Sequence, residues 1–318
     1  MARDLDINDA VARKVLNDAE GVFFSRELEA VRAKSYDVKY ADLTFRTVFP
    51  ISHETPAGSG SVTIQTYDGT ALAKIINGYA NDLPRAEIKG TELILPVHQI
   101  GNMYAYTTKE IRTSNLVQKS LDTRRSALTF RGHEEKNNQI AWNGDAETGL
   151  YGLFTYPGIP AANVAGADAT ARLWSTKIAT PDLIIADLNQ AIASMRSVTK
   201  MKEMPNAILM PVEQFNLISS TPRSTTSDTT ILQYFLNNNS AGIKSVTPIN
   251  ELEGAGTAGV DVFVLYNNSP DSLVYELPME FTQHEVQRVG LEFQIPCESE
   301  AAGLIVYYPL SLAIWEGI

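Results

Sequence analysis

The clearest regular pattern in the chain is a polar helix that starts near Asp122 and should run for about 22 residues, or roughly 33 Å. Ser120 can cap this helix, the carboxylate of Asp122 suits its first turn, and Gly144 follows its last turn. Its apolar residues are too sparse for a continuous stripe: Leu121, Ala127, Leu128, Phe130, Ile140 and Trp142. Most of the helix should therefore face solvent, polar surface or neighbouring chains, although an ordinary surface helix fits the same pattern.

The chain before this helix is expected to begin with a charged helical arm over residues 1–42. Asn8 can cap a segment in which apolar residues recur at helical spacing: Val11, Val15 and Ala19. The arm can pack on its own domain or on a neighbour. The alternation of Leu43, Phe45, Thr47 and Phe49 with polar or smaller residues then predicts a strand that ends at Pro50.

Residues 58–90 have strand character but few residues that can form a core. Residues 62–67 alternate, and Asp68-Gly69 is a strong signal for a hairpin turn. A long two-stranded excursion is only marginally stable alone, so it should pack against something else. The alternative is a hairpin folded back on its own domain, with solvated charges at Lys74, Arg85, Glu87 and Lys89.

Strands are predicted over residues 92–97 and 103–106, and the capping-box pattern from Thr107 to Glu110 should open a short helix. Residues 161–170, which are rich in Ala, Gly and Asn, are expected to form a loop at a domain boundary.

Helix and strand signals then alternate, which is typical of a separate α/β domain over residues 179–278. A helix should begin at Thr180-Pro181-Asp182, with Ile184, Leu188, Ala191, Ile192 and Met195 on one face. The other predicted elements are a buried strand at 207–210, a helix from Pro211, a polar loop at 221–230, a helix capped by Asp228, and strands at 260–266 and 273–277.

The chain returns to β character at its end. Val286, Val289, Leu291, Phe293 and Ile295 suggest one strand, and further strands are expected at 303–308 and 310–315. These strands can pair with strands from the first half. The α/β segment would then be an insertion in one discontinuous domain of an α+β protein.

Composition excludes several classes of protein. With 318 residues and 44% hydrophobic content the chain can bury a large core, and its net charge of -11 argues against strong binding to DNA or anionic membrane in free solution. The single cysteine, Cys297, excludes an internal disulfide framework. The start has no apolar segment of signal-peptide type, and the most apolar run, 303–315, is too short to span a bilayer. We therefore expect no membrane partner.

Two sequence patterns resemble catalytic or cofactor motifs and fail on their context. The glycines at 254, 256 and 259 fit GxGxxG, but a dinucleotide site needs a helix after them and a strand is expected there. The run from His133 begins like a zinc-protease HExxH motif, but Asn137 replaces the second histidine. We predict no catalytic residue, cofactor or metal, and treat a nucleotide-binding α/β enzyme as an alternative from another class.

Six short motifs cover roughly residues 40–160. They are Tyr79-Ala80-x-Asp82-Leu83-Pro84-Arg85-Ala86, Ile100-Gly101-x-x-Tyr104-x-Tyr106, Leu121-Asp122-x-x-Arg125, Asn138-x-Ile140-Ala141-x-x-Gly144-Asp145, Gly149-Leu150-x-Gly152-Leu153 and Pro157-Gly158-Ile159. Together they resemble the major capsid proteins of tailed double-stranded DNA bacteriophages, in a branch catalogued as a phage capsid domain of unknown function. Beyond this region only the order of elements is similar.

The resemblance implies the Hong Kong 97-like fold, with the polar helix as its spine. The expected parts are an N-terminal arm (1–42), a peripheral domain (43–57, 91–178 and 279–318), an extended loop (58–90) and an inserted axial domain (179–278). The implied function is an icosahedral shell of hexamers and pentamers in the virion, assembled in the host cytoplasm and holding double-stranded DNA by confinement. Scaffolding and portal proteins are implied as partners, with decoration proteins as a further candidate. An encapsulin-like nanocompartment shell is the alternative with the same fold.

We expect the extended loop and the spine to supply contacts between subunits. The candidate residues are Tyr67, Asp68, Lys74, Arg85, Glu87, Arg124 and Arg131. Arg124 and Arg131 are seven residues apart and so lie on the same side of the helix. They can face DNA or pair with carboxylates of a neighbouring subunit, and we favour the second because nearby carboxylates neutralise cations on an acidic protein more readily than DNA that enters later.

Overall fold

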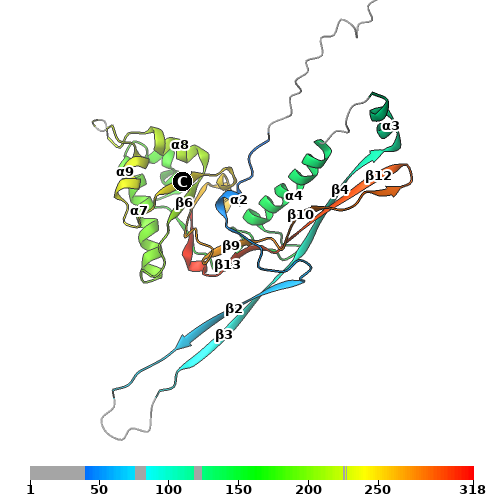
Figure 1. The fold of residues 1–318 in the computed structure, drawn as a ribbon. Helices are drawn as coiled ribbons and strands as arrows, with labels where there is room; N and C mark the ends of the chain where they lie inside the picture. Colours follow the sequence, from blue (N-terminus) through cyan, green and yellow to red (C-terminus); the bar gives the residue numbers. More distant parts are fainter. Residues whose placement is uncertain (1–39, 76–83, 118–123, 225, 227) are drawn as a thin grey trace, which may run out of the picture. The chain divides into compact units, whose positions relative to one another are not determined.

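Two strands that lie far apart in the sequence form the longest pairing of the main sheet. In the computed structural model, β4 (His98–Thr107) and β12 (Glu292–Ala301) pair antiparallel from end to end, as Figure 1 shows. This confirms the prediction that strands at the end of the chain pair with its first half.

The structure describes residues 40–75, 84–117, 124–224, 226 and 228–318. It divides into units 1–42 and 43–318, and the predicted helical arm lies almost wholly outside the described residues.

Two shorter strands, β10 (Met279–Gln283) and β11 (Gln287–Val289), pair antiparallel with β12. The prediction of one strand through residues 286–295 is therefore wrong. The chain reverses at Gly290, whose φ of 62° is in the left-handed region that glycine adopts without steric cost. The apolar alternation of this segment belongs to the two arms of a hairpin and does not reveal the reversal.

The spine helix α4 (Arg124–Asn143) packs on β4 and β12, and the polar-helix prediction is confirmed over these 20 residues. Gly144 follows it with a φ of 69°, as expected for a helix end. The expected start at Ser120 and Asp122 lies outside the described residues. Helix α3 (Thr108–Val117) follows β4 and begins with the predicted capping box, because the Thr107 amide donates to Glu110 at 2.9 Å and the Glu110 amide donates to the Thr107 hydroxyl at 3.2 Å.

Residues 43–49, which were expected to form a strand, instead contain the short helix α2 (Phe45–Val48). The Asn138 side chain on the spine accepts hydrogen bonds from the amides of Thr44, at 3.2 Å, and Phe45, at 3.0 Å. These are amides that a helix start leaves without partners, so a residue far away in sequence stabilises the helix. Phe45, Val48 and Phe49 are buried and Thr47 is exposed, which is helical spacing and not the alternation of a strand.

A small three-stranded sheet follows α2. It has the order β1-β9-β13, from β1 (Ile51–Ser52), β9 (Leu273–Glu276) and β13 (Gly303–Val306). The predicted strand at 273–277 is confirmed, and its pairing with 51–52 and 303–306 places it outside the sheet of the inserted segment.

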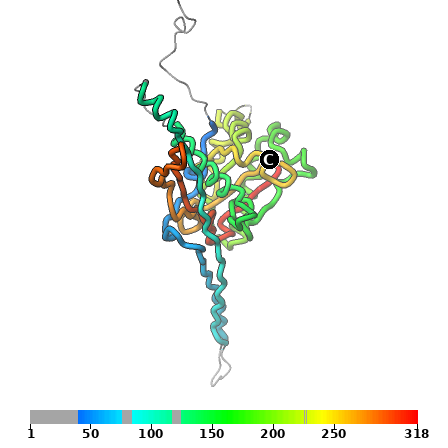
Figure 2. Tube along the Cα trace, turned by 90° about the vertical axis from the view of Figure 1, so that its right-hand side faces the viewer, coloured from blue at the N-terminus to red at the C-terminus, as the bar shows by residue number. Residues whose placement is uncertain are grey.

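The two strands of the extended loop, β2 (Ser61–Thr70) and β3 (Glu87–Pro96), pair antiparallel over ten residues each and form a structure that we call the ribbon. Figure 2 shows the ribbon leaving the rest of residues 43–318. The turn predicted at Asp68-Gly69 is wrong, because Asp68 is in the ladder opposite Lys89. A hairpin turn at Asp68-Gly69 would leave Glu87–Pro96 without its partner strand. The observed register also places the opposite charges of Asp68 and Lys89 directly across from each other.

The inserted segment is built on a five-stranded sheet of order β5-β14-β8-β6-β7. Its strands are β5 (Ala161–Asn163), β14 (Leu312–Glu316), β8 (Val262–Tyr266), β6 (Ala207–Met210) and β7 (Ser245–Pro248). Residues 161–163 were expected in a loop, and they form a strand because β14 offers its edge for parallel pairing. The sheet thus contains strands from outside the 179–278 range.

Helices α7 (Pro181–Val198), α8 (Val212–Ser220) and α9 (Ile231–Asn238) belong to this segment, with the short α5 (Ala169–Arg172) and α6 (Trp174–Lys177) before them. The predicted start of α7 at Pro181 and its buried face are confirmed. The cap of α9 is Thr230 and not Asp228, since the Thr230 hydroxyl accepts from the Gln233 amide at 3.3 Å. Three 3-10 turns complete the elements: η1 (Asn250–Leu252), η2 (Thr257–Gly259) and η3 (Pro309–Ser311).

The five-stranded sheet separates two hydrophobic cores. Leu209, Val264 and Leu312 lie in the core that also contains the spine residues Ile140 and Trp142. Ile208 and Leu265, their neighbours on the strands, lie in the core formed with α7 and α9. Because side chains alternate along a strand, the three central strands β6, β8 and β14 contribute to both cores.

Candidate assembly surfaces

A partly buried ion cluster joins the spine helix to two other parts of the chain. The Arg46 guanidinium donates to both carboxylate oxygens of Glu134, at 2.7 and 2.8 Å, and to both of Glu280, at 3.0 and 2.8 Å. These paired contacts raise the pKa of Arg46 and lower that of Glu280. The side chain of Glu134 is nearly buried, so Arg46 compensates a charge that water cannot reach. The cluster ties α2 and β10 to the spine.

His133 lies in a second polar network under the spine. Its Nδ1 is 2.8 Å from the Ser299 hydroxyl and its Nε2 is 2.8 Å from Oδ1 of Asn102. Asn102 donates its amide to the Thr129 carbonyl, so its Oδ1 is an acceptor and the proton of His133 must be on Nε2. Burial lowers the pKa of His133, with Glu134 opposing the shift. The residue that begins the HExxH-like run is thus a neutral structural histidine.

Arg125, which belongs to one of the capsid-like motifs, fixes the first turn of the spine against β4 and α3. Its guanidinium pairs with Glu110 at 2.7 Å and lies 4.9 Å from the ring centre of Tyr106. The hydrogen bond from Arg125 lowers the pKa of Glu110 to about 2. Glu110 therefore both caps α3 and anchors the spine, and Arg125 brings two of the capsid-like motifs into contact through Tyr106.

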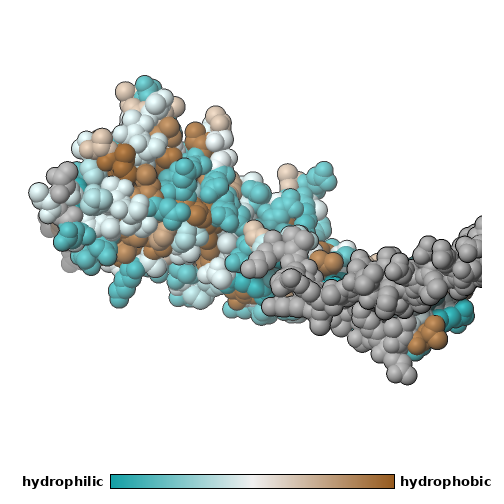
Figure 3. Space-filling model, turned by 90° about the horizontal axis from the view of Figure 1, so that it is seen from above, coloured by the Kyte–Doolittle hydropathy of each residue, from teal (hydrophilic) through white to brown (hydrophobic). Residues whose placement is uncertain are grey.

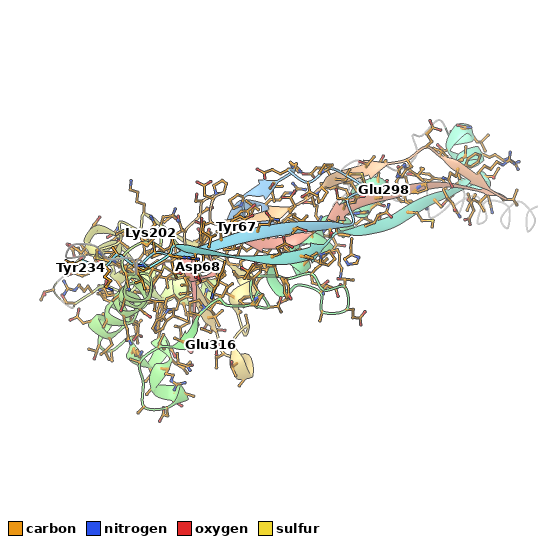
Figure 4. The ribbon with its side chains drawn as sticks, turned by 90° about the horizontal axis from the view of Figure 1, so that it is seen from below. Tyr67, Asp68, Lys202, Tyr234, Glu298 and Glu316 are labelled. Atoms are coloured by element: carbon orange, nitrogen blue, oxygen red, sulfur yellow. The ribbon has the colours of Figure 1, made fainter. Side chains whose placement is uncertain are left out.

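The five candidate contact residues in the extended loop all lie on or beside the ribbon and are exposed. Tyr67 and Asp68 are in β2, Glu87 is in β3, and Lys74 and Arg85 are in the connection between the strands. Figure 4 shows Tyr67 and Asp68 along β2. The Tyr67 ring lies over Gly90 on the opposite strand, because a β carbon on Gly90 would be 3.3 Å from Cε1 of Tyr67. Tyr67 thus also supports the pairing of the ribbon itself.

The two spine arginines are not brought next to the ribbon residues. Arg124 and Arg131 lie on α4, and Arg131 pairs with Glu135 on the next turn at 2.7 Å. A partly exposed pair of this kind contributes little to stability.

Sequence reasoning missed a group of exposed apolar residues on β4, α3 and the β11–β12 hairpin. Their exposed fractions range from 53% to 84% in Met103, Leu116, Val286, Val289 and Leu291. The alternation of residues 286–295 was visible in the sequence, but it suggested one strand and not an exposed apolar surface. Figure 3, seen from above, shows hydrophobic and hydrophilic residues intermixed over much of the visible surface.

The described residues give no support to a cofactor or metal site. They contain no cluster of three or more His, Cys, Asp or Glu side chains that could hold a metal ion. In the glycine-rich loop, the amide of Gly254 donates to Asp261 at 2.8 Å and the amide of Gly256 donates to the Val260 carbonyl at 2.8 Å. Within the described part of the chain no helix is long and apolar enough to cross a membrane.

The exposed ribbon, the polar spine and the two cores that share one sheet fit a structural, shell-forming class of protein. A sequence model of the family described as "Major capsid protein" matches residues 71–318. The chain belongs to this major capsid protein family, and it is a shell-forming phage capsid protein of the virion.

Solved structures share the fold at low sequence identity. The capsid of Myoviridae phage XM1 is 16% identical, with a TM-score of 0.78, over 94% of this chain and 99% of that one. A chain of Mycobacterium phage Bobi is 12% identical, with a TM-score of 0.57, over 92% of this chain and 98% of that one. The capsid of an empty GTA particle is 11% identical, with a TM-score of 0.54, over 91% of this chain and 94% of that one. No curated protein matches the chain.

Proposed function

We propose that the chain forms hexamers and pentamers that close into an icosahedral shell around double-stranded phage DNA. The observation that carries the proposal is the ribbon, in which all residues from 65 to 70 and from 87 to 92 are exposed. An isolated two-stranded ribbon is at best marginally stable in water, so it needs a surface on which to lie. A neighbouring subunit supplies that surface in a closed shell.

Assembly by many modest contacts explains why a capsid subunit needs no catalytic centre. The arm, the extended loop, the spine and the axial domain each contribute an interface, and symmetry repeats every contact around the shell. We assign these parts to residues 1–42, 58–90, the α4 helix and 179–278, with the peripheral domain formed by 43–57, 91–178 and 279–318. The separate sheets of the peripheral and inserted segments support this division, and three strands cross its bounds: β5 and β14 belong to the five-stranded sheet, and β9 belongs to the three-stranded sheet.

Confinement, and not affinity, holds the DNA in this proposal. The net charge of -11 makes the subunit repel phosphates on average, since tight binding requires clustered Lys and Arg. We further propose that the shell is assembled in the host cytoplasm, with scaffolding and portal proteins and, as an additional partner, decoration proteins.

The experiment that tests the role of the ribbon is a shortened chain. Thr66 and Thr91 are directly opposite in the ladder, so replacement of residues 67–90 by Asn-Gly leaves a proximal hairpin with a two-residue turn. The buried and half-buried ribbon residues, Val62, Ile64, Leu93 and Leu95, are retained. We expect this chain to fold and to form no shells by electron microscopy.

Gly69→Ala is the matched control. Gly69 is in the ribbon, and a β carbon there would meet no atom within 4 Å. This variant should fold and form particles like the wild type. Normal particles from the shortened chain would show that the ribbon is not the assembly element.

A further inference from the structure

The strand β4 forms one border of the four-stranded sheet and has a partner strand on one side only. It pairs with β12 over residues 98–107, and no other strand in the described part of the chain pairs with it. Proteins usually protect such an edge with charges or proline, or keep the strand short. β4 has ten residues, where five or six are usual, and it contains no Asp, Glu, Lys, Arg or Pro. Its free edge is therefore long and unprotected.

The register shows which backbone groups of β4 point to this free edge. Met103 is opposite Pro296, which has no N–H and whose carbonyl accepts from the His284 amide at 2.9 Å. Pro296 therefore makes no backbone hydrogen bond to β4, so the N–H and C=O of Met103 point away from β12. Gln99 and Gly101 share this orientation, because it alternates along the strand. None of these three amides has a hydrogen-bond partner among the described residues.

Gly101 is a second sign of a close approach at this edge. Its φ is not in the left-handed region, and a β carbon there would meet only the Cys297 carbonyl oxygen, at an ordinary 3.8 Å. Nothing in the chain itself therefore requires glycine at this position. Glycine inside a strand weakens it, and it often marks a place where another backbone comes close.

The ribbon also has free edges, and the β2 edge is the less protected one. The Val97 amide donates to the Gly60 carbonyl at 3.2 Å, which identifies the hydrogen-bonded pairs of the ladder. By alternation, residues 61, 63, 65, 67 and 69 of β2 point their backbone groups outward. Residues 61–67 contain no charge and no proline, whereas β3 carries Glu87, Lys89 and Glu92 and ends at Pro96. β2 and β4 are thus two unprotected edges of ten residues each.

The β2 edge does not meet the β4 edge of its own chain. Gln65 is opposite Glu92, and Glu92 precedes Gln99 by seven residues of extended chain, about 23 Å. The β2 edge also points away from β3, the strand that leads into β4. A second copy of the chain is free of this constraint and can add its strand to an exposed sheet edge.

We propose that the free edge of β2 pairs with the free edge of β4 in an adjacent copy, so that the ribbon extends the sheet of its neighbour. This inference rests on the proposed shell and specifies how the ribbon is held in it, through backbone hydrogen bonds along an edge. The absence of Asp, Glu, Lys and Arg from residues 61–67 and from β4 means that no like charges oppose the pairing.

Two proline variants on one rung of the ribbon test the proposal. Gln65 and Glu92 are directly opposite, and both N–H groups point outward, so each strand tolerates proline there within the ribbon. Both variants also lose the same side-chain hydrogen bond, from Gln65 to Glu92 at 3.0 Å. Gln65→Pro should lower the particle yield about tenfold or more, because it removes a donor from the β2 edge and its ring obstructs the added strand. Glu92→Pro is the matched control and should assemble like the wild type.

The β4 edge is tested in the same way at Met103. Met103→Pro removes the outward N–H, whereas Met103→Ala removes the side chain and keeps the N–H. The proline variant should lower the particle yield about tenfold or more, and the alanine variant should assemble. Urea unfolding of the unassembled chains shows that both fold, and electron microscopy and sedimentation measure the particles.

Amide hydrogen exchange of the wild type tests the pairing without any substitution. The amides of Gln65, Gly101 and Met103 should exchange fast in the unassembled chain and about tenfold or more slowly in particles. Thr66 and Asn102, which are already paired in the ladders, provide the internal reference. Fast exchange at the three outward amides in particles would overturn the proposal.

The outcomes separate this inference from the proposed shell. If the wild type forms no particles, the proposed function fails. If the wild type forms particles and Gln65→Pro or Met103→Pro assembles as well as its control, the pairing of these two edges is wrong and the shell remains.

Discussion

Gly144 and Gly152 touch each other where the spine helix ends. A β carbon on Gly144 would lie 2.8 Å from the amide nitrogen of Gly152, and one on Gly152 would lie 2.5 Å from the Ile140 carbonyl oxygen. Both distances are shorter than real side chains allow, so the turn that follows the spine closes only with glycine at these positions. This contact gives a physical reason for the two glycines in the capsid-like motifs.

The first prediction is that Gly152→Ala destabilises the unassembled chain by about 1–3 kcal/mol, the usual cost of forcing extra atoms into a packed site. The surrounding atoms are backbone of the spine and cannot move away easily. Urea unfolding measures the change. Gly60→Ala is the control, because a β carbon there meets nothing within 4 Å and the backbone needs no left-handed conformation. Equal stability of the two variants would refute the packing argument.

The second prediction concerns the ion cluster. Arg46→Met should cost about 2–3 kcal/mol of unfolding free energy, below the full range for buried pairs because the Arg46 side chain is a third exposed. The cost arises because Glu134, itself nearly buried, loses its cation. Glu135→Gln removes a more exposed pair with Arg131 and should cost no more than about 0.5 kcal/mol. A cost for Arg46→Met no larger than this control would show that the cluster does not stabilise the fold.

The third prediction is a pH dependence from His133. An unfolded histidine has a pKa of about 6.5, and burial lowers the pKa of His133 in the folded chain. Below about pH 6.5 the unfolded chain therefore binds a proton that the folded chain does not, and stability falls by at most about 1.4 kcal/mol per pH unit until the folded pKa is reached.

Unfolding measured between pH 7 and 5.5 should show a smaller decline in His133→Gln than in the wild type. The stability that is lost at lower pH through carboxylates provides an internal control. Arg46 lowers the pKa of Glu280, so this carboxylate stabilises the fold above its ordinary pKa of 4.5, and its contribution disappears as the pH falls further. The Glu280 contribution should be the same in both proteins, so the difference between the two curves reports His133. An unchanged slope above pH 5.5 would contradict the role of His133.

The fourth prediction is that charge reversal at Arg124 and Arg131 impairs shell formation before any DNA enters. Both arginines lie on the spine, and we propose that they meet carboxylates of a neighbouring subunit. Electron microscopy of the expressed protein should show few or no particles. Arg112→Glu, on the exposed side of α3, is the control and should assemble. If the double variant forms normal empty shells and fails only to retain DNA, the arginines face the genome instead.

Several elements were predictable because their causes lie within a few residues of each other. The capping box between Thr107 and Glu110, the start of α7 at Pro181 and the end of the spine at Gly144 each depend on local geometry. The buried face of α7 follows from helical spacing alone. The resemblance carried by the capsid-like motifs indicated that the polar helix is the spine, that residues 58–90 are an extended loop, and which family the chain is similar to. Residue spacing by itself gives none of these.

The tertiary structure decided the rest, because partners distant in sequence determine it. Asn138 makes residues 45–48 a helix where alternation suggested a strand. The partner strand Glu87–Pro96 carries β2 straight through Asp68-Gly69, and β14 turns a predicted loop into β5. The partners of Arg46 likewise depend on which segments meet in space. Strand pairing and polar networks are long-range interactions, so local sequence patterns limit them but do not select one arrangement.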